Sequence, residues 1–141
     1  MITIHPPNQR QFQAARRILK AAGLDPTTPL RIEHTLIAEV ESKVVGVGQI
    51  KQHTGCQELG SLVVLPEYQR HGIAGQLIAA LEARVERPLY LTCMETMAAY
   101  YIRFGYAVIP YREYPRYFKL KLLLALIGRW FGWRVELMRK Q

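Results

Sequence analysis

Residues 62–81 limit most strongly what this chain can fold into. The stretch begins with an apolar run, residues 62–65, which Pro66 ends, and continues through a polar turn that contains Gly72. Apolar side chains then recur at the spacing of one helix face, at Ile73, Leu77, Ile78, Leu81 and Val85. The pattern predicts a strand, a glycine-containing loop and a helix over residues 73–86.

The start of the predicted helix is suited to an anion. The first backbone N–H groups of a helix have no partner inside it, and the helix dipole makes that end positive. The consecutive amides of residues 70–75 would therefore suit a phosphate group, because Gly72 lets the backbone approach closely. A second interpretation is that Gly72 only permits a tight turn, since the pattern Gln-x-x-Gly-x-Ala alone is weakly specific.

The chain has 141 residues, of which 50% are hydrophobic. This size and composition suit a single domain over residues 1–141 with a substantial core. The formal net charge of +8 is uneven, because residues 1–109 carry a net +2 and residues 110–141 a net +6. Such a tail is suited to nucleic acid or an anionic membrane, or it is a solvated face that helps to attract an anionic cofactor.

Cys56 and Cys93 lack the paired spacing of a zinc site or of a C-x-x-C redox motif, so we expect reduced thiols and no metal. The N-terminal residues show neither the basic nor the apolar segment of a signal peptide. The longest apolar run, residues 122–127, is far shorter than the ~20 residues that span a bilayer. We therefore expect a cytoplasmic protein without a transmembrane segment.

The remaining pattern predicts an α/β domain that begins with an antiparallel meander. Alternating and β-branched residues predict strands over residues 2–5, 35–40, 44–52, 58–65, 89–92, 106–109 and 133–138. Cap signals and helical spacing predict helices from Asn8 to Gly23 and over residues 73–86, 95–104 and 117–127, with a loop over residues 25–31. Because a helix separates them, the strands before and after the glycine loop should be parallel neighbours.

Two motifs within this order resemble a known family. They are Gln69-x-x-Gly72-x-Ala74 and Tyr100-Tyr101-Ile102-Arg103-Phe104-Gly105-Tyr106. Their separation and the order of the predicted elements are similar to those of the GNAT superfamily of acyl-CoA-dependent N-acetyltransferases. The resemblance covers residues 2–109, with residues 133–138 as the last strand. It implies a mixed, mostly antiparallel sheet flanked by helices, with an extra C-terminal helix before the last strand.

The resemblance implies acetyl-CoA as co-substrate and assigns its binding residues. Members bind the cofactor pyrophosphate on backbone donors of the loop that opens with Gln69, here Arg70, His71, Gly72, Ile73, Ala74 and Gly75. They pair the pantetheine arm with the preceding strand, here Leu62, Val63 and Val64. The Arg70 guanidinium either adds a charge-assisted contact or is solvated. An asparagine that contacts the cofactor in many relatives is replaced here by Met94, which puts one contact in doubt.

The resemblance also implies two catalytic residues. Tyr101, four residues before Gly105, corresponds to the tyrosine that protonates the departing thiolate, and a phenol keeps its proton at neutral pH. Glu58, eleven residues before Gln69, corresponds to the general base of one branch of the family, where it acts through water. The alternatives are that Tyr101 only packs on the core and that Glu58 is a structural strand-end residue.

The segment 110–132 exceeds the simple hairpin that joins the last two strands in small family members. It interleaves aromatic residues with lysines and arginines. The first interpretation is one more core helix, with an apolar face formed by Leu120, Leu123, Leu124 and Ile127 and with lysines at its edge. A homodimer contact is the second, while nucleic acid and a membrane surface are disfavoured.

We therefore expect an N-acetyltransferase that moves an acetyl group from acetyl-CoA to a primary amine by direct attack in a ternary complex. The acceptor, a small molecule or a peptide amine, stays open. One alternative is a non-catalytic acyl-CoA-binding regulatory module, and another is a basic nucleic-acid-binding protein.

Overall fold

The computed structural model describes residues 1–23, 30–123 and 134–141 of the chain. These residues form two compact units, Met1–Lys51 with Leu59–Glu86 and Gln52–Glu58 with Arg87–Gln141. Most of the loop predicted over residues 25–31, the end of the helix predicted over residues 117–127 and the start of the strand predicted from Trp133 lie outside the described residues.

The described strands are hydrogen-bonded in the order β1-β2-β3-β4-β5-β7-β6. Their bounds are β1 Ile2–His5, β2 Thr35–Val40, β3 Lys43–His53, β4 Cys56–Val64, β5 Leu89–Met94, β6 Ala107–Val108 and β7 Val135–Lys140. The recorded pairs β1–β2, β2–β3, β5–β7 and β6–β7 are antiparallel, and β4 pairs parallel with β5, where Glu58 lies opposite Tyr90. The predicted mixed, mostly antiparallel sheet and its parallel pair are confirmed.

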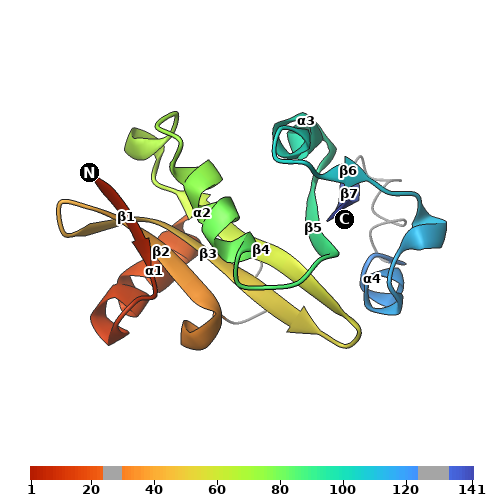
Figure 1. Ribbon diagram of the computed structural model, residues 1–141, viewed down its shortest axis with the longest axis horizontal. Helices are drawn as coiled ribbons and strands as arrows, with labels where there is room; N and C mark the ends of the chain where they lie inside the picture. The colour runs from red at the N-terminus through yellow and green to blue at the C-terminus, as the bar shows by residue number, and fades with distance from the viewer. Residues whose placement is uncertain (24–29, 124–133) are drawn as a thin grey trace. The chain divides into compact units, whose positions relative to one another are not determined.

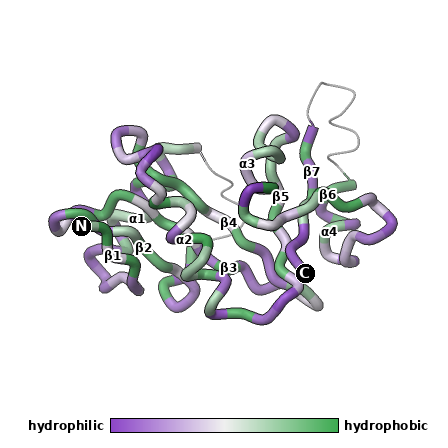
Figure 2. The backbone as a smooth tube through the Cα atoms, turned by 45° about the horizontal axis from the view of Figure 1, so that its top comes forward, coloured by the Kyte–Doolittle hydropathy of each residue, from purple (hydrophilic) through white to green (hydrophobic). Residues whose placement is uncertain are grey.

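In the first unit, α1 (Gln9–Ala21) and α2 (Ile73–Glu82) cover opposite faces of the strands, shown in red to green in Figure 1. Ala15 of α1 packs with Ile37 and Val47 in one buried cluster. On the other face, a Cβ at Gly48 would lie 2.8 Å from Leu81 of α2, so glycine permits the close approach of this helix. Figure 2 shows hydrophobic stretches along β2 and α2, and Ile37 and Leu81 within them are fully buried.

In the second unit, α3 (Ala98–Ile102) and α4 (Arg116–Lys121) lie on opposite sides of the short strands (Figure 1). Phe118 of α4 is fully buried in a cluster with Tyr90, Ile109 and Leu137. Because successive residues of a strand face opposite sides, the neighbours Leu89 and Leu91 face the α3 side. The second unit therefore has its own layered core.

Two predicted helices differ in extent from the observed ones. The helix predicted over residues 73–86 ends earlier, at Glu82, with Ala83 as its C-cap. The helix predicted over residues 95–104 is a 3₁₀ turn (Glu95–Met97) followed by the short α3, and Gly105 with φ +92° ends it as expected. Three further 3₁₀ turns, Ile32–His34, Pro66–Tyr68 and Tyr111–Glu113, were not predicted.

The apolar face predicted for the C-terminal helix is wrong in its described part. Leu120 is 76% exposed and Leu123 52% exposed, whereas Phe118 is fully buried. The larger aromatic side chains bury more apolar area than the leucines, so α4 turns Tyr117 and Phe118 inward. The segment still supplies a core helix, as expected, but on a different face.

Candidate active site

The glycine loop leads directly into the start of α2. Gly72 has φ +78° and precedes the first helical residue, and the first helical bond runs from the Gln76 amide to the Gly72 carbonyl, at 3.1 Å. For the amides of residues 70–75, no backbone acceptor is recorded in the described part of the chain. A Cβ at Gly72 would meet nothing within 4 Å, so the backbone is open to a ligand there. These features fit a bound phosphate.

Side chains of the loop hold its shape. The Gln69 amide donates to the Val64 carbonyl at 3.1 Å and so ties the loop to the end of β4. His71 Nδ1 lies 2.9 Å from the Gln69 carbonyl oxygen, which can only accept, so the imidazole donates this bond. Arg70 has φ +66°, a conformation that costs a non-glycine residue about 1–2 kcal/mol. Such local strain is typical of functional loops.

Sequence reasoning missed an irregularity in β4, just before the residues predicted to pair the pantetheine arm. Ser61 has φ +51°, which interrupts the extended backbone, and its hydroxyl accepts a hydrogen bond from Gln49 at 3.1 Å. Leu62 and Val63 after it are half-buried, and Val64 is buried. No residue type signals this feature, because a left-handed backbone ordinarily calls for glycine or asparagine.

Glu58 lies in a buried polar cluster of the second unit. The residue is 2% exposed, and its carboxylate lies 2.8 Å from His53 Nε2 and accepts a hydrogen bond from the Thr92 hydroxyl at 3.1 Å. The carboxylate also raises the pKa of the Cys56 thiol, although burial of that thiol is the larger cause. Sequence reasoning missed both His53 and Thr92. A two-residue turn at Thr54–Gly55 would have put His53 on the same strand face as Glu58.

Tyr101 lies on α3, half-buried, and its phenol keeps its proton at neutral pH. Burial, helped by the nearby Cys93 and Tyr100, raises the pKa of Tyr101 to about 12. Burial, helped by Glu136, likewise raises the pKa of Cys93 to about 11. Both groups are therefore neutral hydrogen-bond donors at physiological pH.

Glu58 and Tyr101 lie on opposite faces of β5. Thr92, which bonds Glu58, and Cys93, which lies near Tyr101, are successive residues of that strand. Successive side chains of a strand point to opposite faces. The second unit thus offers a buried carboxylate cluster on the α4 side of β5 and a neutral phenol on the α3 side.

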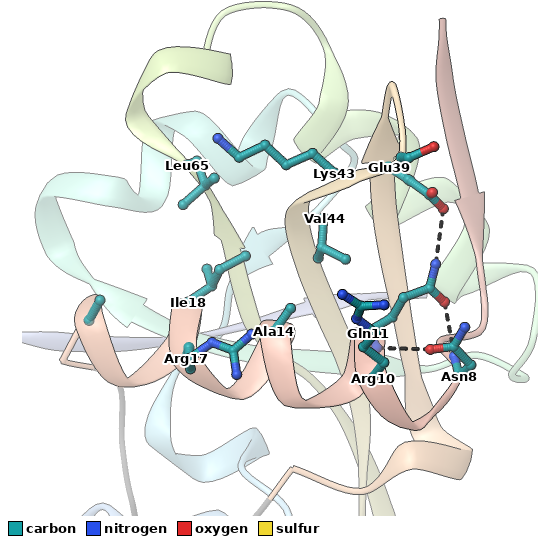
Figure 3. Close-up of a pocket in the computed structure, with 12 residues that line it drawn as sticks. Asn8, Arg10, Gln11, Ala14, Arg17, Ile18, Glu39, Lys43, Val44 and Leu65 are labelled. Atoms are coloured by element: carbon teal, nitrogen blue, oxygen red, sulfur yellow. Dashed lines mark hydrogen bonds between the residues drawn. The ribbon is translucent and has the colours of Figure 1, made fainter.

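A separate groove of about 760 Å³ lies in the first unit, between α1 and the turn that joins β2 to β3 (Figure 3). Arg10, Arg17 and Lys43 line it together with the Glu39 carboxylate, which accepts a hydrogen bond from Gln11 at 3.2 Å. None of the residues predicted for cofactor binding or catalysis lines this groove.

Among the described residues, no group of three or more His, Cys, Asp or Glu side chains could hold a metal ion. Within the same residues, no helix is both long enough and apolar enough to span a bilayer.

Several solved structures have a similar fold. N-acetylglutamate synthase from Neisseria gonorrhoeae, solved with coenzyme A and N-acetyl-glutamate, has a TM-score of 0.77 at 14% identity, over 99% of this chain and 35% of that one. Rv2747 from Mycobacterium tuberculosis, solved with CoA, has a TM-score of 0.69 at 16% identity, over 96% and 97% of the two chains. An acyl-CoA N-acyltransferase from Pseudomonas aeruginosa has a TM-score of 0.66 at 16% identity, over 100% and 99%.

This chain therefore spans about a third of the length of the gonococcal synthase, 35%. No curated protein sequence matches the chain. A family model does match: the acetyltransferase (GNAT) domain, over residues 31–108. That range contains the glycine loop and both predicted catalytic positions, and it covers more than half of the chain. The chain belongs to the GNAT acetyltransferase family.

Proposed function

We propose that this protein transfers an acetyl group from acetyl-CoA to a primary amine by direct attack within a ternary complex. The observation that carries the proposal is the open row of amides at residues 70–75, before and at the start of α2, in a GNAT domain. A phosphate-bearing co-substrate suits such a row, because oriented N–H groups and the helix dipole both favour negative charge.

The residues that would hold acetyl-CoA lie in the first unit. The amides of residues 70–75 would bind the pyrophosphate, and the Arg70 guanidinium would add a charge-assisted bond. The backbone of Leu62, Val63 and Val64 would pair with the amide groups of the pantetheine arm, as one strand pairs with another. Two of the similar structures were solved with coenzyme A, which supports this choice of co-substrate.

The reaction requires two protons to leave the acceptor nitrogen. An ammonium group must lose one proton before its lone pair can attack the thioester carbon. As the C–N bond forms and the C–S bond breaks, the nitrogen loses the second proton and the thiolate must gain one. We assign uptake of the first proton to the buried cluster that contains Glu58, and donation to sulfur to Tyr101. Because the two groups lie on opposite faces of β5, the first proton would reach the cluster through water and not by direct contact with the acceptor nitrogen.

The high pKa of Tyr101 limits how it acts. A thiol has a pKa of roughly 8.5, so transfer of a proton from a phenol of pKa about 12 to a free thiolate is uphill by roughly 5 kcal/mol. Tyr101 therefore donates a hydrogen bond to the departing sulfur, and its proton transfers fully only as the attacking nitrogen loses its second proton. This coupling suits direct attack, in which both events belong to one complex.

The location and assembly of the protein are further parts of the proposal. A cytoplasmic location is supported by the free thiols of Cys56 and Cys93, which suit a reducing compartment. A homodimer would cover the exposed Leu120 and Leu123 of the inserted segment. Sedimentation over a range of protein concentrations tests the dimer, and a constant monomeric mass would exclude it.

An acceptor panel tests the proposed activity. Amino acids, glutamate first, belong in it because the gonococcal synthase was solved with N-acetyl-glutamate, and peptide amines and polyamines complete it. Mass spectrometry should detect an N-acetylated amine and an equal amount of free CoA with the native chain but not with Gly72→Glu, whose side chain would occupy the phosphate position. Binding of CoA without any acetylated amine would instead support a non-catalytic acyl-CoA-binding module.

A further inference from the structure

His53 and Glu58 form a buried ionisable pair at the end of the hairpin that joins β3 to β4. The His53 Nε2 to Glu58 Oε1 distance is 2.8 Å, and the two side chains are only 7% and 3% exposed. A carboxylate removed from water to this extent requires partners that replace its hydration. The pair is therefore a fixed unit rather than a contact between two solvated side chains.

Thr92 fixes the second oxygen of the carboxylate. Its hydroxyl donates to Glu58 Oε2 at 3.1 Å, while Oε1 faces His53. Each carboxylate oxygen thus has a different partner, one from β3 and one from β5. The carboxylate cannot rotate without losing both bonds, so it holds the imidazole in one orientation.

Aromatic rings from the inserted segment hold the imidazole from its sides. The ring of Tyr117 is stacked on that of His53, with centroids 3.7 Å apart and planes 11° apart. Phe118 meets the same imidazole edge-on, at 5.9 Å and 88°. The two rings therefore fix the plane and the position of the imidazole.

The geometry also orients the two nitrogens of His53. An ionised carboxylate can only accept, so Nε2 carries the hydrogen and Nδ1 is left as the acceptor. No hydrogen bond to His53 Nδ1 is recorded within the part of the chain that the structure describes. A carboxylate that orients an imidazole in this way is the arrangement of a general base with its positioning residue.

We propose that His53 Nδ1 takes up, through a water molecule, the proton that the acceptor ammonium loses, and that Glu58 is the positioning residue of this base. This inference rests on the proposed acetyl transfer. The proton leaves the nitrogen, its electron pair becomes the nucleophile, and the proton arrives on Nδ1 to give an imidazolium. The Nε2–H bond to Glu58 persists, and the imidazolium later releases its proton to water.

The titratable and charged groups around the pair come from three elements. From β4 come Glu58 itself and Cys56, from β5 comes Tyr90, and from α4 come Tyr117 and Lys121, whose ammonium lies 5.7 Å from the Tyr117 ring. Glu58 lies in contact with the imidazole, and the Tyr117 ring contacts both the imidazole and the Lys121 ammonium.

Kinetics of His53→Gln test the role of His53. Glutamine can still donate to Glu58 but cannot take up a proton, so kcat at neutral pH should fall about 10²-fold or more. The KM for acetyl-CoA should stay within about twofold of the native value. A higher KM reports lost binding of the ground state, and His53 has no proposed part in binding acetyl-CoA. The acid limb of the kcat/KM profile should disappear. His34→Gln is the control, because it removes a histidine that has no part in the proposed site.

Two kinetic outcomes would overturn the inference. One is an unchanged rate in His53→Gln. The other is a lower rate in His53→Gln whose kcat/KM profile against pH keeps the acid limb of the native enzyme, which would mean that the pair is only structural. Glu58→Gln alone should lower kcat. Because the two residues act as a unit, the double variant Glu58→Gln/His53→Gln should be little slower than His53→Gln. Losses that multiply in the double variant would contradict the proposed unit.

Nitrogen-15 NMR of the imidazole in the native chain without substrate tests the orientation independently of turnover. Nε2 should carry the hydrogen in the neutral ring, and acidification should add the second proton at Nδ1. In Glu58→Gln this tautomer preference should be lost. A neutral ring that carries its hydrogen on Nδ1 would refute the inference, whereas failure to find any acetylated amine would refute the proposed function and leave this result standing.

Discussion

Gly72 is a single residue on which the cofactor site depends. Its φ of +78° strains a residue with a side chain, and a side chain there would extend from the loop whose amides have no backbone acceptor among the described residues. Gly55, in the turn between β3 and β4, has φ +80° and the same open surroundings. The two glycines therefore differ in location and not in backbone requirement.

Alanine at these two positions separates backbone strain from ligand binding. Gly72→Ala and Gly55→Ala should each lower the free energy of unfolding by about 1–2 kcal/mol, measured by denaturant titration. Only Gly72→Ala should also weaken CoA binding in calorimetry, because its methyl group holds the phosphates away from the amides. Equal affinities in both variants would show that CoA does not approach this glycine.

The neutral phenol of Tyr101 gives a second prediction. Tyr101→Phe should lower kcat about 10²-fold with little change in the KM for acetyl-CoA, since the hydrogen bond to sulfur forms only as the thiolate leaves. Because the pKa of Tyr101 is about 12, its ionisation should not lower the native rate up to about pH 10. If release of free thiol gives the Tyr101→Phe variant the same kcat as the native chain, Tyr101 only packs against the core.

His5 is a residue whose protonation contributes to stability. Its Nδ1 faces the Pro6 carbonyl at 2.8 Å and its Nε2 faces the Glu39 carboxylate at 2.6 Å, so both nitrogens meet acceptors. The Pro6 carbonyl first, and then Glu39, raise the pKa of His5 above 6.5. Because the pKa of His5 is higher in the folded than in the unfolded protein, its protonation contributes fully to stability at pH values below the unfolded-state pKa. The contribution is lost as the pH rises through the folded-state pKa.

Chemical unfolding at two pH values checks this contribution. The difference in unfolding free energy between the native chain and His5→Gln should be larger near about pH 6 than near about pH 8.5. It should stay below about 1 kcal/mol, because the pair is partly solvated. A difference that grows as pH rises would contradict the assigned direction of the pKa shift.

Among the elements, those with strong local signals were predictable. Asn8 and Gln11 form the capping box that starts α1, with Asn8 accepting from the Gln11 amide at 2.9 Å. The strand, loop and helix around Gly72 were recognisable for the same reason, because turn residue and periodicity agree. The family resemblance added the position of Glu58. His53 was missed, although the two-residue turn at Thr54–Gly55 sets the register that puts both residues on one strand face.

The inserted helix shows where periodicity misleads. Leucines at helical spacing predicted one buried face, yet the aromatic residues of α4 bury a larger area on another face. Phe118 contacts both Tyr90 and the His53 imidazole, with ring centroids 5.9 Å away in each case. Phe118 of α4 is therefore both a core residue of the second unit and a side chain that packs against the proposed base, His53.

Two alanine substitutions on α4 check the face that it buries. Phe118→Ala should lower the free energy of unfolding by about 3–5 kcal/mol, because it removes a fully buried ring. Leu120→Ala, on the same helix but 76% exposed, should change it by less than about 0.5 kcal/mol. Thermal or urea unfolding measures both values, and similar losses in the two variants would mean that the helix buries the leucine face.

For the whole molecule, the fold class follows from the sequence more completely than the site does, although the position of β7 between β5 and β6 was not predicted. The glycine loop and the order of strands and helices sufficed for a mixed sheet with one parallel pair. The active-site chemistry depends instead on side chains brought together by tertiary structure, such as Thr92 and His53 on the two sides of Glu58. The cationic C-terminal part likewise proved to contribute buried aromatic residues, which its net charge does not indicate.

Initial rates of thiol release, measured over a grid of acetyl-CoA and amine concentrations, test the central claim most directly. Direct attack in a ternary complex predicts that release depends on the amine and that double-reciprocal plots intersect. Equal release without amine would indicate hydrolysis, and parallel plots would indicate an acetylated enzyme intermediate. Either result, or binding of acetyl-CoA with no amine-dependent release at all, would contradict the account.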